Sequence, residues 1–307
     1  MLKNFLDIKD IEITELRAIL LHASELKRER LNKPKGAKDS KQLLKNFVVA
    51  LIFEKPSTRT RFSFDVGIRQ MGGETIIVSK SEIHLGKNEN IADTARVLSR
   101  YVDLVILRTF DQKVLFEFAE YSSVPVINGL TNQSHPCQVL ADIFTYEECR
   151  GPIRGKKVTW AGDGNNVCNS YLQAAGKFGF SFCFFGPENY RPDLQLITEM
   201  GNRGSDIVLT VDPNVAFQQA DLVVTDTWLS MHERNNMEKI KTFQMFQVNS
   251  EKMNLVKEDT IVLHCLPAHR GYEITDSVID GEKSRVFDAA ENRLHVQKAI
   301  MSWALNL

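Results

Sequence analysis

Short runs of consecutive hydrophobic residues alternate with amphipathic stretches along most of the chain. The runs predict buried strands at 47–53, 74–78, 103–107, 124–128, 158–161, 182–185, 207–211, 222–225 and 260–265. Amphipathic patterns predict helices at 57–71, 90–101 and 135–149 in the first half, and between most of the later strands. Continuously apolar strands separated by helices are typical of parallel sheets that are covered on both faces. The pattern therefore predicts an α/β fold.

The turn-rich sequence GPIRGKK interrupts this pattern at 151–157. A chain of 307 residues is long enough for two cores. We predict two domains, each a parallel sheet flanked by helices, linked by long helices. The first spans 1–150, the second 151–289, and a C-terminal helix at about 290–307 packs back on the first. In such folds ligands bind beyond the carboxyl ends of the strands.

The composition indicates which classes of partner and which cellular compartment to expect. A net charge of −1, with 25% charged residues, gives no reason to expect nucleic acid or an anionic membrane as a partner. The N-terminal residues are acidic and lack the apolar core of a signal peptide, and no run approaches the roughly 18 apolar residues of a membrane span. The five cysteines are scattered, without a C-x-x-C pair, which argues against a disulfide framework or a structural zinc site. We expect a cytoplasmic protein.

The sequence FEKPSTRTR, residues 53–61, follows the first strong strand. Pro56 favours a helix start, and Ser57 and Thr58 lie in its first turn, where free backbone N–H groups bind anions. Arg59 and Arg61 oppose the helix dipole there, at a cost of about 0.3–1 kcal/mol each when exposed. A bound dianion would reverse that sign. The alternative is a capped helix with two solvated arginines.

Other polar residues stand at strand ends or helix starts. Arg108 ends the strand DLVILR, and Arg293 lies in the late sequence AENR; each alone could be a surface arginine. His135 and Gln138 share a helix face in HPCQ and could hold a carbonyl and an amide together, or be structural.

The second half offers polar groups suited to an amine. GDGNNVCNS, residues 162–170, resembles a dinucleotide fingerprint, but Val167 stands where the third glycine is required. Asn165 and Asn166 could bind an amino-acid head group or cap a helix. Asp226, at the end of DLVVTD, could pair with an α-ammonium group or cap a turn. Cys265, at the end of TIVLHC, could be a core residue or a neighbour of a substrate amine.

Taken together, these stretches resemble the ornithine carbamoyltransferase family along nearly the whole chain. The matching motifs are FEKPSTRTR, DTARVLSRYVD, HPCQVLAD, GDGNNVCNS, DTWLSM, HCLPAHRG and AENR. The related aspartate enzymes typically have HPTQ and HPLPR where this chain has HPCQ and HCLPAHR. The difference favours ornithine over aspartate.

The resemblance implies a role for each matching residue. The carbamoyl-phosphate group would be bound by Ser57, Thr58, Arg59, Thr60, His84, Arg108, His135, Gln138, Cys265, Leu266 and Arg293. Among these, Arg108, His135, Cys265 and Arg293 would be catalytic. Ornithine would be held by Asn166, Asp226, Ser230 and Met231. His84 resembles a residue lent to a neighbouring subunit, which implies a homotrimer. No metal and no cofactor are implied.

One position departs from the family pattern, which has glycine where this chain has His232. If that residue takes φ > 0, His232 would strain the turn. A transferase that uses putrescine or another amine is therefore an alternative to ornithine. A nicotinamide dehydrogenase is disfavoured by Val167, and a non-catalytic anion-binding protein would form no citrulline. The sequence does not distinguish arginine biosynthesis from citrulline breakdown.

Overall fold

The computed structural model describes residues 2–79, 82, 89–229 and 236–307. The chain forms two compact units: unit 1 comprises Met1–Ala141 and Glu291–Leu307, and unit 2 comprises Asp142–Ala290. The division falls inside α5 (Pro136–Arg150), whereas the turn-rich sequence lies after that helix. Each unit is described by itself below.

Unit 1 contains a parallel sheet with the strand order β2-β1-β3-β4. Its strands are β1 (Val48–Phe53), β2 (Glu74–Ser79), β3 (Leu104–Arg108) and β4 (Val126–Leu130). Strands β3 and β4 are buried along their whole length, as continuous apolar runs require. The chain near Phe5 pairs in parallel with Ile127, beside β4.

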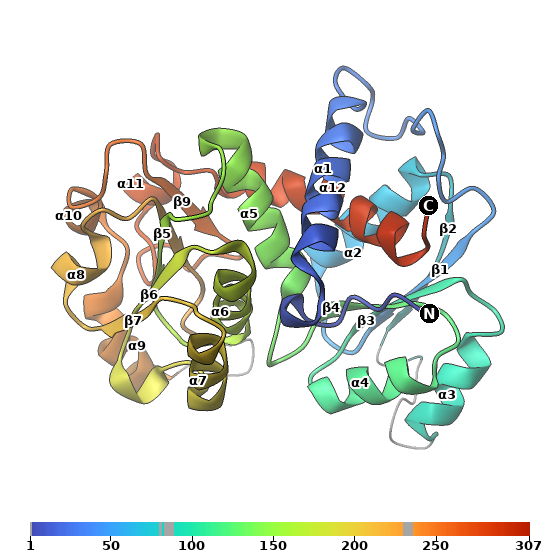
Figure 1. Cartoon of the computed structure of the whole chain (residues 1–307), viewed down its shortest axis with the longest axis horizontal. Helices are drawn as coiled ribbons and strands as arrows, with labels where there is room; N and C mark the ends of the chain where they lie inside the picture. Colours follow the sequence, from blue (N-terminus) through green and yellow to red (C-terminus); the bar gives the residue numbers. More distant parts are fainter. Residues whose placement is uncertain (1, 80–81, 83–88, 230–235) are drawn as a thin grey trace. The chain divides into compact units, whose positions relative to one another are not determined.

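Helices flank this sheet (Figure 1). They are η1 (Ile8–Asp10), α1 (Ile13–Arg28), α2 (Thr58–Gln70), α3 (Ile91–Leu98), α4 (Gln112–Tyr121) and, from Glu291 onward, α12 (Val286–Ala304). Helices α3 and α4 contribute Ala95, Leu115 and Phe118 to a core that they share with Ile52 and Leu107 of the sheet. Burying such side chains stabilises the fold by roughly 1.5–3 kcal/mol each.

Unit 2 contains a second parallel sheet, with the strand order β7-β6-β5-β8-β9. Its strands are β5 (Lys157–Ala161), β6 (Ser181–Phe185), β7 (Ile207–Thr210), β8 (Leu222–Thr225) and β9 (Ile261–His264). Three aromatic rings anchor one face: the ring centroid of Phe185 lies 5.5 Å from that of Phe217 and 4.8 Å from that of Phe246. The predicted α/β fold with two parallel sheets is confirmed.

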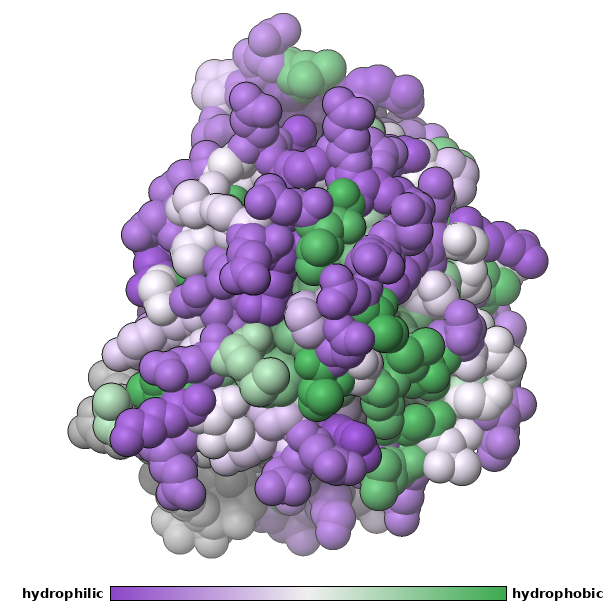
Figure 2. Space-filling model, turned by 90° about the vertical axis from the view of Figure 1, so that its left-hand side faces the viewer, coloured by the Kyte–Doolittle hydropathy of each residue, from purple (hydrophilic) through white to green (hydrophobic). Residues whose placement is uncertain are grey.

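The helices of unit 2 are α5 from Asp142 onward, α6 (Asn166–Phe178), η2 (Glu188–Tyr190), α7 (Leu194–Asn202), α8 (Pro213–Phe217), α9 (Met237–Phe243), η3 (Gln244–Phe246), α10 (Ser250–Met253) and α11 (Asp276–Ile279). Figure 2 shows a face that is largely hydrophilic but carries a band of hydrophobic residues. Across the described part of the chain, every helix is too short or too polar to cross a membrane.

The strand order places a switch point in each sheet. In unit 1 the chain moves outward in one direction from β1 to β2 and in the other from β1 to β3 and β4. In unit 2 the same reversal occurs between β5 and β8. Open α/β sheets bind ligands at such points, because the loops beyond the two central strands diverge there. The segments after β1, β3, β5 and β8 are therefore the first places to look for a site.

Candidate active site

In unit 1, helix α2 begins directly after the segment that leaves β1. Ser57 is its N-cap, and the Ser57 hydroxyl accepts a hydrogen bond from the backbone N–H of Thr60 at 3.3 Å. The first turn of α2 contains no acidic side chain that would match the positive end of the helix dipole. It carries Arg59 instead. This helix start is suited to an anion.

Thr60 lies between two arginines of unit 1. Its side chain is buried, and its hydroxyl oxygen accepts hydrogen bonds from Arg293 at 2.9 Å and from Arg108 at 3.4 Å. One hydroxyl thus joins guanidinium groups from the end of β3 and from α12, which are 185 positions apart in the chain. Arg108 and Arg293, each of which could have been a surface arginine, therefore meet at one buried residue.

His135 and Gln138 lie at the start of α5 and are both buried. Burial, followed by the nearby charges of Arg293, Arg108 and Arg59, holds the pKa of His135 well below its ordinary value. The three arginines that the resemblance assigns to carbamoyl phosphate therefore lie near one neutral imidazole. A neutral imidazole can donate one hydrogen bond to a carbonyl oxygen without adding a further positive charge.

In unit 2, the turn between β5 and α6 explains the two glycines of GDGNN. Gly162 has φ = +130°, a conformation that side chains rarely adopt. A Cβ on Gly164 would lie 2.3 Å from the backbone nitrogen of Pro192, so only glycine fits there. Both glycines are required by the path of the backbone. They need no dinucleotide to account for them.

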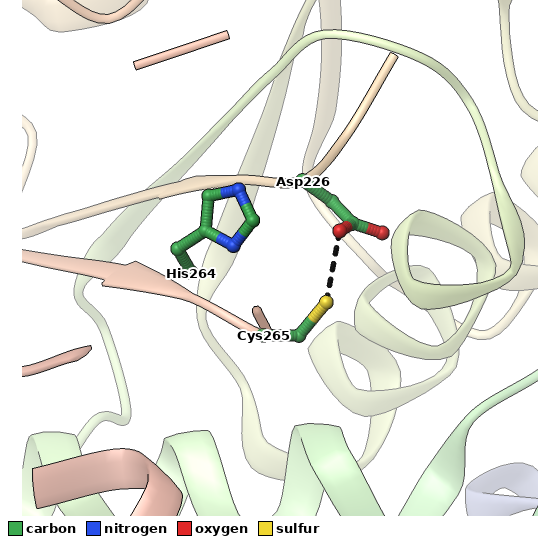
Figure 3. A group of neighbouring side chains, drawn as sticks. All are labelled: Asp226, His264 and Cys265. Carbon is green, nitrogen blue, oxygen red and sulfur yellow. Dashed lines mark hydrogen bonds between the residues drawn. The ribbon is translucent and has the colours of Figure 1, made fainter. Parts of the chain in front are cut away.

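Asp226 follows β8 and is held by donors from three segments. Its Oδ1 accepts hydrogen bonds from the Cys265 thiol at 2.9 Å and from the backbone N–H of Thr227 at 2.8 Å, and its Oδ2 accepts one from the Asn165 amide at 2.8 Å. Figure 3 shows the Cys265 side chain pointing at the carboxylate. The carboxylate is largely buried and held in one orientation. Such a group binds a cation well.

Asp226, His264 and Cys265 place one ligand atom each within 4.8 Å of one another, a set that could hold a metal ion. The His264 ring is already engaged on both sides, however: Nδ1 accepts from the backbone N–H of Leu266 at 2.8 Å, and Nε2 bonds to buried Glu273 at 3.1 Å. Cys265 donates to Asp226. A metal would have to replace these bonds, so the donor set fits a hydrogen-bonded network better than a metal site.

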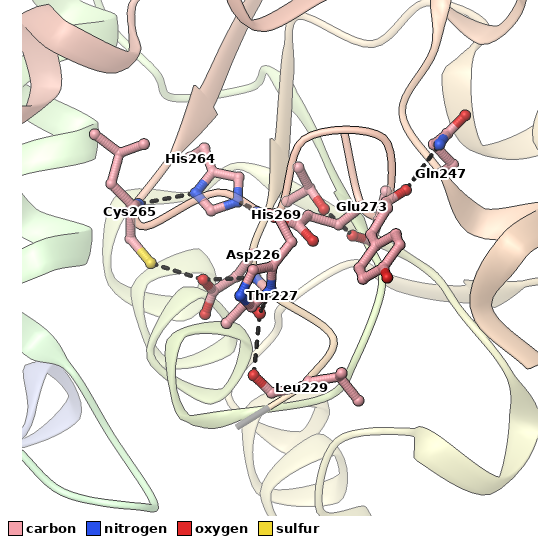
Figure 4. A network of polar contacts seen from close by, with 12 residues as sticks. Asp226, Thr227, Leu229, Gln247, His264, Cys265, His269 and Glu273 are labelled. Carbon is pink, nitrogen blue, oxygen red and sulfur yellow. Dashed lines mark hydrogen bonds and ion pairs between the residues drawn. The ribbon is translucent and has the colours of Figure 1, made fainter. Parts of the chain in front are cut away.

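Figure 4 shows how this network continues. Glu273 also accepts a hydrogen bond from the backbone N–H of His269 at 2.5 Å. The His269 ring bonds to the Thr227 hydroxyl at 2.8 Å, and that hydroxyl donates to the carbonyl oxygen of Leu229 at 3.0 Å. The loops that carry Asp226 and Cys265 are therefore tied together by side chains.

The predicted residues thus fall into three sets. Within unit 1 the structure brings together Arg59, Thr60, Arg108, His135 and Arg293, with Ser57 and Thr58 at the start of α2. Within unit 2 it joins Asp226 and Cys265, while Asn166 opens α6. His84, Ser230, Met231 and also His232 lie outside the described residues.

Asn165, for which the sequence left a head-group role and a helix cap open, caps α6 by accepting hydrogen bonds from the N–H groups of Val167 and Cys168, and it also donates to Asp226. The sequence analysis missed two other residues that support the site. Glu273 and Lys239 are buried and bond to His264 and Asp163. A buried charged residue is unusual enough to be noticed, but its burial is not visible in the sequence.

Comparisons with known proteins agree with this geometry. The family model "Aspartate/ornithine carbamoyltransferase, carbamoyl-P binding domain" matches residues 3–148, and the model "Aspartate/ornithine carbamoyltransferase, Asp/Orn binding domain" matches residues 154–304. The chain is 55% identical to an ornithine carbamoyltransferase of Ruegeria pomeroyi over 99% of both chains, and 54% identical to one of Cereibacter sphaeroides over 100% of both.

Solved structures give the same result. The chain resembles the ornithine carbamoyltransferase of Pyrococcus furiosus with a TM-score of 0.93 and 42% identity, covering 99% of this chain and 97% of that one. It resembles the anabolic ornithine carbamoyltransferase of Campylobacter jejuni with a TM-score of 0.90 and 38% identity, covering 99% of each chain.

Proposed function

The chain belongs to the aspartate/ornithine carbamoyltransferase family, and on that premise we propose how it moves a carbamoyl group from carbamoyl phosphate to the δ-amino group of L-ornithine. The products are L-citrulline and phosphate. The single observation that carries the proposal is the gathering of Arg59, Arg108 and Arg293 around buried, neutral His135. A cluster of cations with a neutral donor suits a dianionic ligand that also contains a carbonyl group.

We assign the phosphate of the donor substrate to the start of α2. Ser57, Thr58, Arg59 and Thr60 would bind its oxygens with hydroxyl, backbone and guanidinium donors. Binding a dianion there would reverse the unfavourable placement of Arg59 at the positive end of the helix. Arg108 would bridge phosphate and carbonyl, because its guanidinium group already reaches Thr60.

The carbonyl oxygen of the donor would face Thr60, Arg108, His135 and Arg293. When the amine attacks the carbamoyl carbon, a C–N bond forms and negative charge builds on that oxygen. The C–O bond to phosphate then breaks, and the phosphate leaves with the bonding electrons while the amine loses a proton. Donors fixed in advance stabilise this charge, and losing one such donor typically costs about 2.7–4 kcal/mol.

The carbamoyl NH₂ group would be held by Gln138 and by the backbone at Cys265 and Leu266. Gln138 is buried, and a buried amide oxygen provides a well-oriented acceptor for that NH₂ group.

Unit 2 would bind the second substrate. We assign the α-ammonium group of ornithine to Asp226, with Asn166, Ser230 and Met231 completing the head-group site and Cys265 near the attacking δ-nitrogen. The support for Asp226 is that its carboxylate is fixed by three donors and stays available as a partner for a cation. The nucleophile must be the neutral amine, which a desolvated site favours.

We further propose a homotrimer in which His84 completes a neighbouring subunit's site. Large apolar side chains that remain exposed in unit 1 support an interface between copies: Phe62, Ile76 and Tyr101 are 64%, 48% and 69% exposed. Sedimentation equilibrium of the purified protein tests the trimer. We also propose that the protein acts in arginine biosynthesis and that it lies in the cytoplasm. Its five free thiols support the second proposal, because they suit a reducing compartment.

An assay of citrulline formation tests the reaction. The purified protein is given carbamoyl phosphate with ornithine, and in parallel with putrescine. We expect citrulline from ornithine and little product from putrescine, which lacks an α-carboxylate. Equal rates with both amines would favour the alternative transferase that uses putrescine or another amine. Absence of both products would refute carbamoyl transfer.

The role of Arg59 can be tested separately by calorimetry with carbamoyl phosphate. Arg59→Ala should greatly weaken binding, because the helix start loses its strongest anion partner. Arg69→Ala is the matched control, since Arg69 lies on the same helix, is exposed and pairs with Asp65. Unchanged affinity in Arg59→Ala would exclude Arg59 from the phosphate site.

A further inference from the structure

Lys239 is an unusual lysine, because it is only 5% exposed. It lies in the first turn of α9, where a cation opposes the helix dipole. Its ammonium nitrogen is 2.8 Å from the Asp163 carboxylate, and it lies over the rings of Tyr190 and Phe243 at 5.2 and 5.9 Å from their centroids. A lysine is buried at this cost only where its partners are well placed. One of these partners, Asp163, lies in the same turn as Asn165, and the Asn165 side chain donates a hydrogen bond to Asp226.

Asp163 belongs to the turn between β5 and α6, and its main chain is fixed on both sides. Its carbonyl oxygen accepts hydrogen bonds from the Trp160 indole at 2.9 Å and from the backbone N–H of Asn165 at 2.8 Å. The neighbouring Gly164 donates its N–H to the carbonyl oxygen of Tyr190 at 2.8 Å. The ion pair with Lys239 adds a side-chain contact to these backbone bonds and ties the turn to α9.

The side chain of Asn165 connects this turn to Asp226. Its side-chain oxygen caps α6, and its side-chain nitrogen donates to Oδ2 of Asp226. Because the oxygen is fixed by the two backbone N–H groups of the cap, the amide nitrogen can point in only one direction. The orientation of the turn thus decides whether this donor reaches Asp226.

We propose that Lys239 is a positioning residue for the amine substrate, acting through Asp163 and Asn165 on the carboxylate of Asp226. The inference rests on the proposed function, since Asp226 is assigned to ornithine. Without the ion pair the turn shifts, the Asn165 amide loses its alignment, and Asp226 binds the α-ammonium group less well. The phosphate and carbonyl groups of carbamoyl phosphate are assigned to residues of unit 1, so the affinity for this substrate should change little.

Steady-state kinetics with both substrates varied tests this inference. Lys239→Met keeps the aliphatic stem and removes the charge. We expect the KM for ornithine to rise about tenfold, which corresponds to about 1.4 kcal/mol, with the KM for carbamoyl phosphate within twofold of the wild type. Lys241→Met is the matched control, because Lys241 is an exposed lysine of the same helix and should leave both constants unchanged.

If Lys239 had a purely structural role, Lys239→Met would lower the melting temperature and would change both KM values together or neither of them. Either result would overturn the inference.

Asn165→Ser provides a second variant that keeps a capping hydroxyl but cannot reach Asp226. It should raise the ornithine KM as Lys239→Met does, and the double variant should be no worse than the poorer single one. A multiplicative, roughly hundredfold rise in the double variant would show that Lys239 acts independently of Asn165. A wild-type protein that forms no citrulline would instead refute the proposed function.

Discussion

Asp7 is a buried carboxyl group in unit 1 whose ionisation opposes folding. It is 2% exposed, and Gln112 donates a hydrogen bond to its Oδ2 at 2.6 Å. Burial is the largest influence and raises the pKa of Asp7 from 3.8 to about 6; Asp10 raises it further, and hydrogen bonds from Ser134 and Gln112 lower it in part. Ser134, which bonds to Asp7, immediately precedes His135, so this carboxyl group lies next to the start of α5.

The raised pKa of Asp7 determines how the free energy of unfolding changes with pH. The folded protein holds the Asp7 proton more tightly than the unfolded chain does, so the free energy of unfolding falls as the pH rises from about 4 to about 6 and is then constant. A difference of about two pH units between the folded and unfolded pKa corresponds to about 3 kcal/mol in total, of which about 1.4 kcal/mol lies between pH 5 and 8. Asp7→Asn removes this dependence.

We expect the stability of Asp7→Asn relative to the wild type to increase by about 1.4 kcal/mol between pH 5 and 8. Urea unfolding followed by ¹⁹F NMR of fluorotryptophan-labelled protein measures it for unit 1, because Trp303, whose ring lies 6.0 Å from that of Phe5, belongs to this unit. Glu120→Gln, which removes one negative charge at an exposed position of α4, is the matched control for the loss of charge. An offset for Asp7→Asn that stays constant between pH 5 and 8 would refute the reasoning.

Three further variants test other contacts. Thr60→Val removes the acceptor shared by Arg108 and Arg293 and should weaken carbamoyl phosphate binding in calorimetry, whereas Thr60→Ser should retain it. Glu273→Met removes the buried acceptor of the His264 ring and should lower the free energy of unfolding by about 1–3 kcal/mol in urea titrations, with Glu273→Gln close to the wild type. Gly164→Ala should cost about 1–3 kcal/mol and raise the ornithine KM, because the new Cβ meets the backbone of Pro192; wild-type values for either would contradict the close approach.

The strands were predictable because burial on both faces leaves a continuous apolar run. The run predicted at 222–225 coincides with β8, and the run at 103–107 differs from β3 by one residue at each end. Residues directly after such strands could also be predicted from the sequence as candidate site residues. Asp226 and Cys265 each follow a strand, and neighbouring parallel strands carry their carboxyl ends to the same edge of the sheet.

Supporting residues could not be predicted in the same way, because their role depends on partners far away in the chain. Lys239 and Asp163 are 76 positions apart, and nothing near either residue indicates the ion pair between them. The amphipathic helix α1 was likewise not among the predicted elements, and its buried residues Leu16 and Ile19 acquire a role only when the core of unit 1 forms.

The pair Asn165 and Asn166 shows where this division between local and distant information lies. The sequence left open whether these residues bind a head group or cap a helix, and the structure shows that Asn165 does the second while orienting Asp226. A cap is a local property, so its sequence signal was correct. The contact with Asp226 arises because β5 and β8 are neighbours at the switch point of the sheet, although they are separated in the chain by β6 and β7. One asparagine can therefore serve folding and substrate binding together, and a variant that separates the two roles, such as Asn165→Ser, measures each.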